Sequence, residues 1–565
     1  MNLFPPARIR CAAAAVLFFG TMLTVSPAWA ALKLPSIFGD HMVLQRDCEL
    51  PVWGTATPGE KVAVRIGPQT REATADKAGK WMVRFAPLHA DGKPVEMEVK
   101  GGRGQSLRFR DVLVGDVWIC AGQSNMGMGV GAVLEKEEIL AGADQPGLRL
   151  FHASRNVAFS PADDLPGKWV VSSPEAIFAN SKNGFSAIGY PFGRALHQHL
   201  GVPVGMIQSA VGGTRIESWS SLEMLQSLPS LPDTQKQLKT FLQKRDTFPE
   251  REREYETVLL PQWQQAYEAL NKAHRQSLDA WKAETEAARQ AGHPLPERPT
   301  PPKPPRHPSA PDNEFSQSCV LFNGMIAPLI PYGICGVIWY QGEANAYPHL
   351  ATEYRALFPA LVADWRQRWA QGAFPFLWVQ LPNLNGKQPE GWSLIRDAQR
   401  RTLAVPGTAM TVALDVGDPD DLHPRSKKAI VDRLILAARA IAYGEPIIYS
   451  GPLLRTAEEK EGTVRLTFEQ VGTGLVIGSG PEVPFRNAAR ARTDALQGFE
   501  IAGDDQRFHP ATAQIAGKQV VVGSPEVPLP RQVRYGWGGN PDPVPNLYNR
   551  EGLPAAPFVS EVTPE

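Results

Sequence analysis

A single serine, Ser124, stands in the segment GDVWICAGQSNMGMGV (residues 115–130), shortly after an apolar run. The apolar run predicts a buried strand, and the Gly, Gln and Asn residues after it predict a turn. A serine hydroxyl is a weak nucleophile, so it needs a base within hydrogen-bond reach and a group that orients that base. Alone, the segment fits an ordinary strand and polar loop equally well.

His423 is the candidate base. It is the one histidine among eleven with a carboxylate three residues earlier, Asp420, in the segment DVGDPDDLHP. A tight turn there can bring the carboxylate to the second imidazole nitrogen, which sets the tautomer and stabilises the imidazolium. Because chance easily supplies an Asp-x-x-His match, its place after a strand and before a helix is what gives it weight.

Acyl transfer also needs hydrogen-bond donors for a developing oxyanion, each worth roughly 3–4 kcal/mol. The candidates are the backbone N–H groups of Ser124 and Gly213 and the side-chain amide of Gln341. Each also has a plain structural interpretation, as a turn residue or as a polar group at a strand end. Arg215, in the same GGTRIESW segment as Gly213, is either structural or faces an anionic substrate.

These residues follow apolar, strand-like runs that alternate with segments of helical periodicity. Alternating strands and helices predict a parallel sheet covered on both faces. In such a sheet, ligands bind beyond the carboxyl ends of the strands, so the polar segments should converge there. The predicted strands are residues 112–121, 203–210, 334–341, 374–381 and 408–416.

Further regions surround this predicted α/β domain of residues 112–445. Residues 31–111 have short apolar stretches with turn signals, which predict a β-sandwich-like domain. Residues 228–312 predict a helical insertion that ends in a proline-rich stretch, because proline cannot continue a helix. Residues 446–565 alternate as β-strands do and close in Gly- and Pro-rich loops.

The first 30 residues have the pattern of a secretory signal: Arg8 and Arg10, an apolar run, and a small-residue cleavage site ending at Ala30. A membrane anchor is the alternative, although the run is shorter than the roughly 20 residues that a spanning helix needs. We therefore expect an exported bacterial protein, secreted or periplasmic, with cleavage after Ala30. No membrane span is expected after removal of the signal.

Composition narrows the functional classes. The chain has 58 Lys+Arg and 58 Asp+Glu residues, so nothing indicates a nucleic-acid surface. Five cysteines, one of them in the signal, are too few for a disulfide scaffold. No Cys/His spacing is typical of a zinc site, so we expect no metal, and the proposed chemistry needs no cofactor.

Four motifs, GQSNM, GGTRIESW, YQGEAN and DLHP, resemble in this order those of the SGNH-type hydrolases of the sialate O-acetylesterase family. That family is close to bacterial carbohydrate acetylesterases. The resemblance implies a flavodoxin-like α/β/α core with a parallel sheet and flanking all-β domains. It also implies Ser124 as nucleophile, His423 as base and Asp420 as its partner. Ser124, Gly213 and Gln341 would then form the oxyanion hole.

Two points depart from the general SGNH pattern. Gln341 stands where many SGNH enzymes have asparagine, although the sialate esterase branch resembles this chain there. Glu343 is a second acid that could orient His423, so Asp420 and Glu343 both stay candidates. Asp418 and Asp421 fit less well, because their spacing to the histidine differs.

The expected function is that of a secreted serine esterase that removes O-acetyl groups from carbohydrates, as a sialate O-acetylesterase does. The main alternative is an acetylesterase of plant hemicellulose, acting on acetylated xylan or xyloglucan. An inactive carbohydrate-binding protein and a lipase or thioesterase are further alternatives. The expected partner is thus an O-acetylated carbohydrate substrate, and the sequence gives no oligomeric state.

Overall fold

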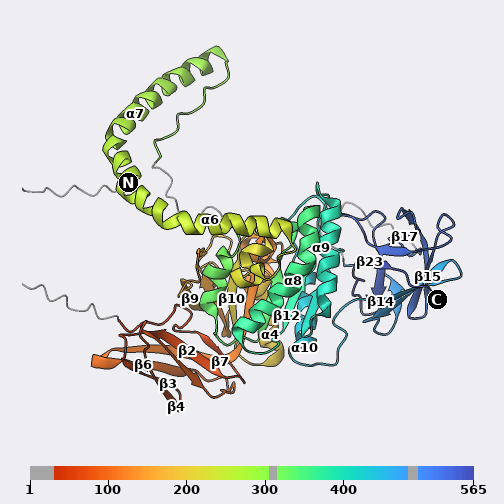
Figure 1. Ribbon diagram of the computed structural model, residues 1–565, viewed down its shortest axis with the longest axis horizontal. Coiled ribbons are helices and arrows are strands. Elements are labelled where there is room, and N and C mark those ends of the chain that lie inside the picture. Colours follow the sequence, from red (N-terminus) through yellow and green to blue (C-terminus); the bar gives the residue numbers. More distant parts are fainter. Residues whose placement is uncertain (1–30, 304–314, 482–493, 565) are drawn as a thin grey trace, which may run out of the picture.

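A mostly parallel sheet forms the centre of the molecule in the computed structural model, which describes residues 31–303, 315–481 and 494–564 (Figure 1). Its strand order is β13-β12-β11-β7-β10-β8-β9, and every neighbouring pair is parallel except β8 and β9. The strands are β7 (Ser106–Gly122), β8 (Gln145–Ala153), β9 (Gly167–Ser172), β10 (Val204–Ala210), β11 (Gly336–Tyr340), β12 (Phe376–Val379) and β13 (Thr408–Thr411).

Four of the five runs predicted as parallel strands contain β10, β11, β12 and β13, and the fifth lies within β7. The prediction of an α/β fold is confirmed, with a central sheet that is mostly parallel. The structure adds β8 and β9, which the sequence analysis did not assign. Strand β8 begins with the polar and turn-forming residues QPG, and its apolar part is short, which weakens the strand signal.

Helices cover both faces of this sheet. Trp118 of β7 contacts Phe192 of α4, with ring centroids 5.1 Å apart. Gly336 of β11 is paired with Trp118, so Trp339, three residues later, points to the opposite face. There Trp339 contacts Trp365 of α8 at 5.9 Å. The covering helices are α4 (Gly189–Leu200), α8 (Pro348–Trp369), α9 (Pro389–Arg401) and α10 (Lys428–Ile441).

Strand β7 is shared between the central sheet and the N-terminal β region. Its first part pairs antiparallel with β6, and its second part pairs with β10 and β11. In β5, KWMVRF, exposed and buried residues alternate, which is the pattern of a strand with one face on a core. The other strands of this region are β1 (Val43–Gln45), β2 (Leu50–Thr55), β3 (Lys61–Ile66), β4 (Gln69–Thr74), β5 (Lys80–Phe85) and β6 (Val95–Lys100).

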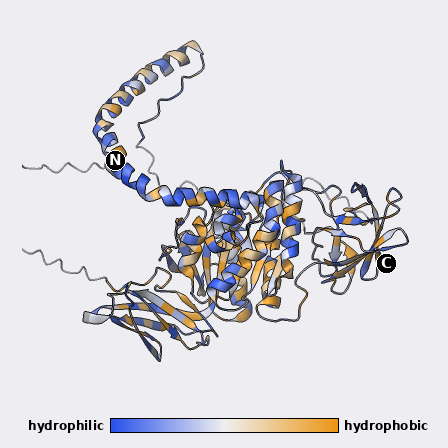
Figure 2. Cartoon of the chain, in the orientation of Figure 1, coloured by the Kyte–Doolittle hydropathy of each residue, from blue (hydrophilic) through white to orange (hydrophobic). Residues whose placement is uncertain are grey.

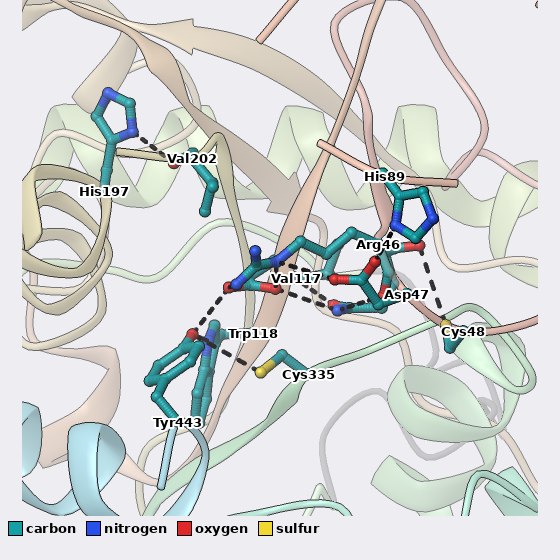
Figure 3. Close-up of polar contacts among 12 residues, drawn as sticks. Arg46, Asp47, Cys48, His89, Val117, Trp118, His197, Val202, Cys335 and Tyr443 are labelled. Carbon is teal, nitrogen blue, oxygen red and sulfur yellow. Dashed lines mark hydrogen bonds and ion pairs between the residues drawn. The ribbon is translucent and has the colours of Figure 1, made fainter. Parts of the chain in front are cut away.

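A polar cluster joins this β region to the central domain (Figure 3). Arg46 Nε donates to Asp116 Oδ1 at 2.8 Å, and the Tyr443 hydroxyl donates to Asp116 Oδ2 at 3.0 Å. Trp118 Nε1 donates to the same hydroxyl at 3.3 Å. The cluster therefore holds the start of the central part of β7 against the end of α10. The cysteines at positions 48, 120, 319 and 335 are free thiols.

The predicted helical insertion is an arm that projects from the body of the molecule (Figure 1). It consists of α6 (Pro232–Glu254), a π-helical turn (Tyr255–Leu259) and α7 (Leu260–Ala291). The base of the arm, α6, packs on α8, and Trp281 Nε1 of α7 donates to Pro296 O at 2.9 Å, so the returning chain lies along α7. Figure 2 shows a largely hydrophilic α6 beside the hydrophobic central strands.

The C-terminal region is β-rich and has a hydrophobic cluster of its own. One sheet has the order β14-β15-β20-β19 and another the order β18-β17-β21-β23. The strands are β14 (Leu453–Lys460), β15 (Thr463–Glu469), β16 (Leu475–Ile477), β17 (Phe499–Ala502), β18 (Phe508–Pro510), β19 (Thr512–Ala516), β20 (Gln519–Gly523), β21 (Gln532–Tyr535), β22 (Leu547–Asn549) and β23 (Phe558–Glu561).

No helix of the described residues is long and apolar enough to cross a membrane. The predicted signal, residues 1–30, lies outside the described residues.

Candidate active site

Ser124 lies directly beyond the carboxyl end of β7, at the start of the short helix α1 (Ser124–Gly127). Gly122, the last residue of β7, has φ +131°, and a Cβ there would lie 2.2 Å from Tyr340 O of β11. Only glycine fits this close approach of two strands. The Gln123 N–H then donates to Tyr340 O at 2.9 Å, so the turn that carries the serine is held to the neighbouring strand.

The structure brings His423 to Ser124, as the strand-end argument predicts. His423 Nε2 lies 2.7 Å from Ser124 Oγ, although the two residues are 299 positions apart in the chain. The histidine is in the loop between β13 and α10 and is half-buried. When the imidazole is neutral with its proton on Nδ1, the serine hydroxyl donates to Nε2, which is the geometry of a nucleophile beside its general base.

The surroundings of His423 favour the neutral form of its imidazole. Burial lowers the pKa of His423, and the nearby cation of Lys427 lowers it further. The Asp421 carboxylate has the opposite effect on this pKa, but it is the smaller influence. A base must be unprotonated to accept the serine proton, so this environment widens the pH range in which His423 is competent.

The turn formed by Gly212 and Gly213 lies against the serine. A Cβ added at Gly212 would be 3.3 Å from Ser124 Cβ. Gly213 has φ +71°, and nothing lies within 4 Å of where its Cβ would be, so that side of the residue is open. Ser124 is the first residue of α1, so its N–H has no acceptor within that helix. The two backbone groups predicted as oxyanion donors are thus on neighbouring turns.

Gln341, the third predicted oxyanion donor, is not directed at Ser124. Its side chain is fully buried, and its Nε2 donates to Thr214 O at 3.1 Å and to Asn345 Oδ1 at 2.8 Å. Its Oε1 accepts a hydrogen bond from the Tyr354 hydroxyl at 3.0 Å. Both amide hydrogens are therefore engaged. Trp339 faces α8, and residues two apart in an extended chain share a face, so the Gln341 side chain also lies in the layer under α8, where Tyr354 lies.

Asp420 does not contact the imidazole in this arrangement. Its side chain is exposed and accepts a hydrogen bond from Asn385 Nδ2 at 3.1 Å, and no hydrogen bond between described residues joins it to His423. The loop has local turns instead: the Asp420 N–H donates to Asp418 Oδ1 at 3.0 Å, and the His423 N–H donates to Asp421 Oδ1 at 2.8 Å. In these turns the carboxylates of Asp418 and Asp421 accept hydrogen bonds from backbone N–H groups.

Glu343, the alternative acid, lies in a buried network rather than on the histidine ring. Asn125 Nδ2 donates to Glu343 Oε1 at 2.7 Å and to Leu422 O at 3.0 Å, and Lys427 Nζ donates to Asn125 Oδ1 at 2.7 Å. Burial raises the pKa of Glu343 and lowers that of Lys427 to about 8. Asn125 therefore fastens the turn after the nucleophile to the loop that carries His423.

Sequence reasoning missed Asn125 and Lys427. Asn125 directly follows the serine in the GQSNM motif, so its position was the available signal. Lys427 had no signal, because a lysine at the start of an amphipathic helix normally points to solvent, whereas this side chain is 1% exposed.

A cavity of about 500 Å³ opens above the serine and histidine. It is wide enough for a small ester and open enough for a larger group attached to it. No group of three or more His, Cys, Asp or Glu side chains in the described chain could hold a metal ion. The residues that line the cavity include Gln123, Ser124, Gly213, Tyr347, Trp392 and His423.

The chain is similar to known carbohydrate esterases. A sequence profile described as carbohydrate esterase, sialic acid-specific acetylesterase, matches residues 114–279 and 321–438. The sialate O-acetylesterase of Mus musculus is 31% identical over 479 residues, which cover 78% of this chain and 80% of that protein. The chain belongs to this carbohydrate esterase family.

A second relative and a crystal structure are similar to most of this chain. The sialate O-acetylesterase of Homo sapiens is 30% identical over 479 residues, 78% of each chain. The crystal structure of a carbohydrate acetylesterase from Xanthomonas citri superposes with a TM-score of 0.72 at 34% identity, covering 94% of this chain and 99% of that one. The predicted family is confirmed, and the protein is a carboxylic ester hydrolase of the carbohydrate acetylesterase type.

Proposed function

We propose that this esterase is an exported serine enzyme that removes O-acetyl groups from sugar hydroxyls, as a sialate O-acetylesterase does. The observation that carries the proposal is the 2.7 Å separation between Ser124 Oγ and His423 Nε2 at the floor of an open cavity. The core is assigned to the SGNH type, with β domains on either side. Export rests on the signal pattern of residues 1–30.

The reaction follows from this pair of side chains. Ser124 Oγ attacks the acetyl carbonyl while His423 Nε2 takes the hydroxyl proton, which gives a tetrahedral intermediate. His423 then returns the proton to the departing sugar oxygen and leaves an acetyl-enzyme. A water molecule, deprotonated by the same nitrogen, attacks the acetyl group, and acetate leaves as Ser124 regains its proton.

The oxyanion of each intermediate is assigned to two backbone donors, the N–H groups of Ser124 and Gly213. Both are on turns whose positions are set by the sheet, so they need little reorganisation during the reaction. Gln341 then has a positioning role: its amide donates a hydrogen bond to Thr214 O and so holds the residue next to Gly213.

Asp420 is assigned as the partner of His423 in preference to Glu343. Glu343 is buried and already accepts a hydrogen bond from Asn125, whereas Asp420 is exposed, in the loop of His423, and its carboxylate accepts a hydrogen bond from Asn385. A Ser-His-Asp triad would require the Asp420 carboxylate to leave Asn385 and accept a hydrogen bond from His423 Nδ1.

The substrate is assigned as an O-acetylated carbohydrate, with sialate esters first because of the family. Acetylated hemicellulose is the second candidate, and the similarity to the Xanthomonas citri carbohydrate acetylesterase is compatible with either substrate. Acetate release from O-acetylated sialoglycan and from acetylated xylan or xyloglucan, compared at equal ester concentration, separates the two candidates.

The direct test of the proposal is the Ser124→Ala variant. We expect it to fold as the wild type does, by thermal melting, and to lose nearly all acetate release from 4-nitrophenyl acetate and from acetylated glycans. A folded variant that keeps most of the activity would exclude Ser124 as the nucleophile.

A further inference from the structure

A second cavity, of about 590 Å³, adjoins the active-site cavity. Gly213, Ala344 and Tyr347 line both cavities, so the turn assigned to the oxyanion separates them. A sugar chain whose acetyl group is at Ser124 can therefore extend into the second cavity. Other residues that line it are Arg215, Gln237, Thr240, Phe241, Phe315 and Ser316.

The guanidinium of Arg215 lines this second cavity, and its charge also acts on the buried carboxylate of Glu217. Arg215 is half-buried, no carboxylate among the described residues lies within ion-pair distance of it, and none of the residues that line the cavity is acidic. Glu217, two positions later, is fully buried, and its carboxylate accepts a hydrogen bond from Asn345 Nδ2 at 2.9 Å. Burial raises the pKa of Glu217, and the hydrogen bond from Asn345 and the charge of Arg215, which lower it, are the smaller influences.

We infer that the second cavity binds a sugar carboxylate of the substrate, through Arg215, while the acetyl ester of the same glycan lies at Ser124. The inference rests on the proposed esterase function. A guanidinium forms paired hydrogen bonds with a carboxylate, and partial burial strengthens them. Tyr347, 47% exposed between the two cavities, offers an aromatic face for the sugar ring.

The helical arm supplies one wall of this carboxylate subsite. Gln237, Thr240 and Phe241 are on α6, the part of the arm that packs on α8 (Figure 1). Glu353 of α8 holds the start of α6 in place, because its carboxylate accepts hydrogen bonds from the N–H groups of residues 233 and 234, both at 2.8 Å. The α6 part of the insertion therefore takes part in substrate selection.

The experiment compares Arg215→Gln with Lys239→Gln. Lys239 is an exposed cation on α6 that lines neither cavity, so its removal makes the same change in net charge. The substrates are 4-nitrophenyl acetate, an O-acetylated sialyl oligosaccharide and an O-acetylated glucuronoxylan oligosaccharide. Each acidic glycan is also used in a form whose carboxylate has been converted to an amide.

We expect Arg215→Gln to lower kcat/KM at least tenfold for a carboxylate-bearing glycan. The same variant should leave the rates for its amide and for 4-nitrophenyl acetate unchanged, and Lys239→Gln should change none of them. The acidic glycan that shows the loss, sialyl or glucuronosyl, identifies the source of the carboxylate. Equal rates for acid and amide in the wild type, or equal losses in Arg215→Gln, would overturn the inference. Failure of the proposed esterase function would give a different result. In that case Ser124→Ala would still hydrolyse 4-nitrophenyl acetate, whatever the effect of Arg215→Gln.

Discussion

The hydrogen bonds of Gln341 lead to a sharp prediction for the variant Gln341→Met. Methionine keeps most of the side-chain volume but removes the amide, so Thr214 O loses its hydrogen-bond donor in a fully buried layer. The Tyr354 hydroxyl loses Gln341 Oε1 but still reaches the backbone carbonyl of residue 341 at 3.4 Å. An unsatisfied buried polar group costs about 1–3 kcal/mol, so the free energy of unfolding should fall by about that amount. Urea unfolding measures this loss.

The activity of the same variant separates a structural role of Gln341 from a catalytic one. Removal of a true oxyanion donor lowers kcat by about 10²–10³. Because both amide hydrogens of Gln341 point elsewhere, we expect kcat of the folded variant on 4-nitrophenyl acetate to fall less than tenfold. Tyr354→Phe is the matched control: it removes the hydroxyl bonded to Gln341 Oε1 and should lower stability modestly at unchanged kcat. A fall of 10² or more in folded Gln341→Met would refute the reasoning.

Two further predictions concern the histidine. Activity should rise as the pH rises through the lowered pKa of His423. Lys427→Met removes a nearby positive charge and should raise this pKa, so the acid limb of the kcat/KM–pH profile should move to higher pH. An unmoved limb would show that Lys427 does not influence the base. Asp420→Asn should lower kcat by roughly 10²–10⁴ if the carboxylate orients the imidazole during the reaction. Glu343→Gln should then have the smaller effect on kcat, and the reverse order would make Glu343 the partner.

Much of the sheet and the central contact of the site could be predicted from the sequence. Apolar runs predicted the strands that precede Ser124 and Gln341. Because segments that follow parallel strands meet at the same edge of the sheet, His423 was expected to lie near Ser124. These predictions need only the course of the backbone. They succeed because strand periodicity and topology are encoded locally.

The directions of individual side chains could not be predicted in this way. Gln341 directly follows its strand, but Thr214 and Tyr354, from other segments of the chain, engage its amide. Asp420 has the expected spacing to the histidine, but Asn385, 35 positions away in the chain, holds its carboxylate in this arrangement. Contacts of this kind arise from tertiary packing and leave no pattern in a single sequence.

The most direct test of the central claim is covalent labelling of the nucleophile. The wild-type protein, treated with a fluorophosphonate probe and digested, should carry the label on Ser124 when its peptides are read by mass spectrometry. His423→Ala should label far more slowly, because the hydroxyl loses the base 2.7 Å away. Labelling of another residue, or equal rates in the two proteins, would contradict the account.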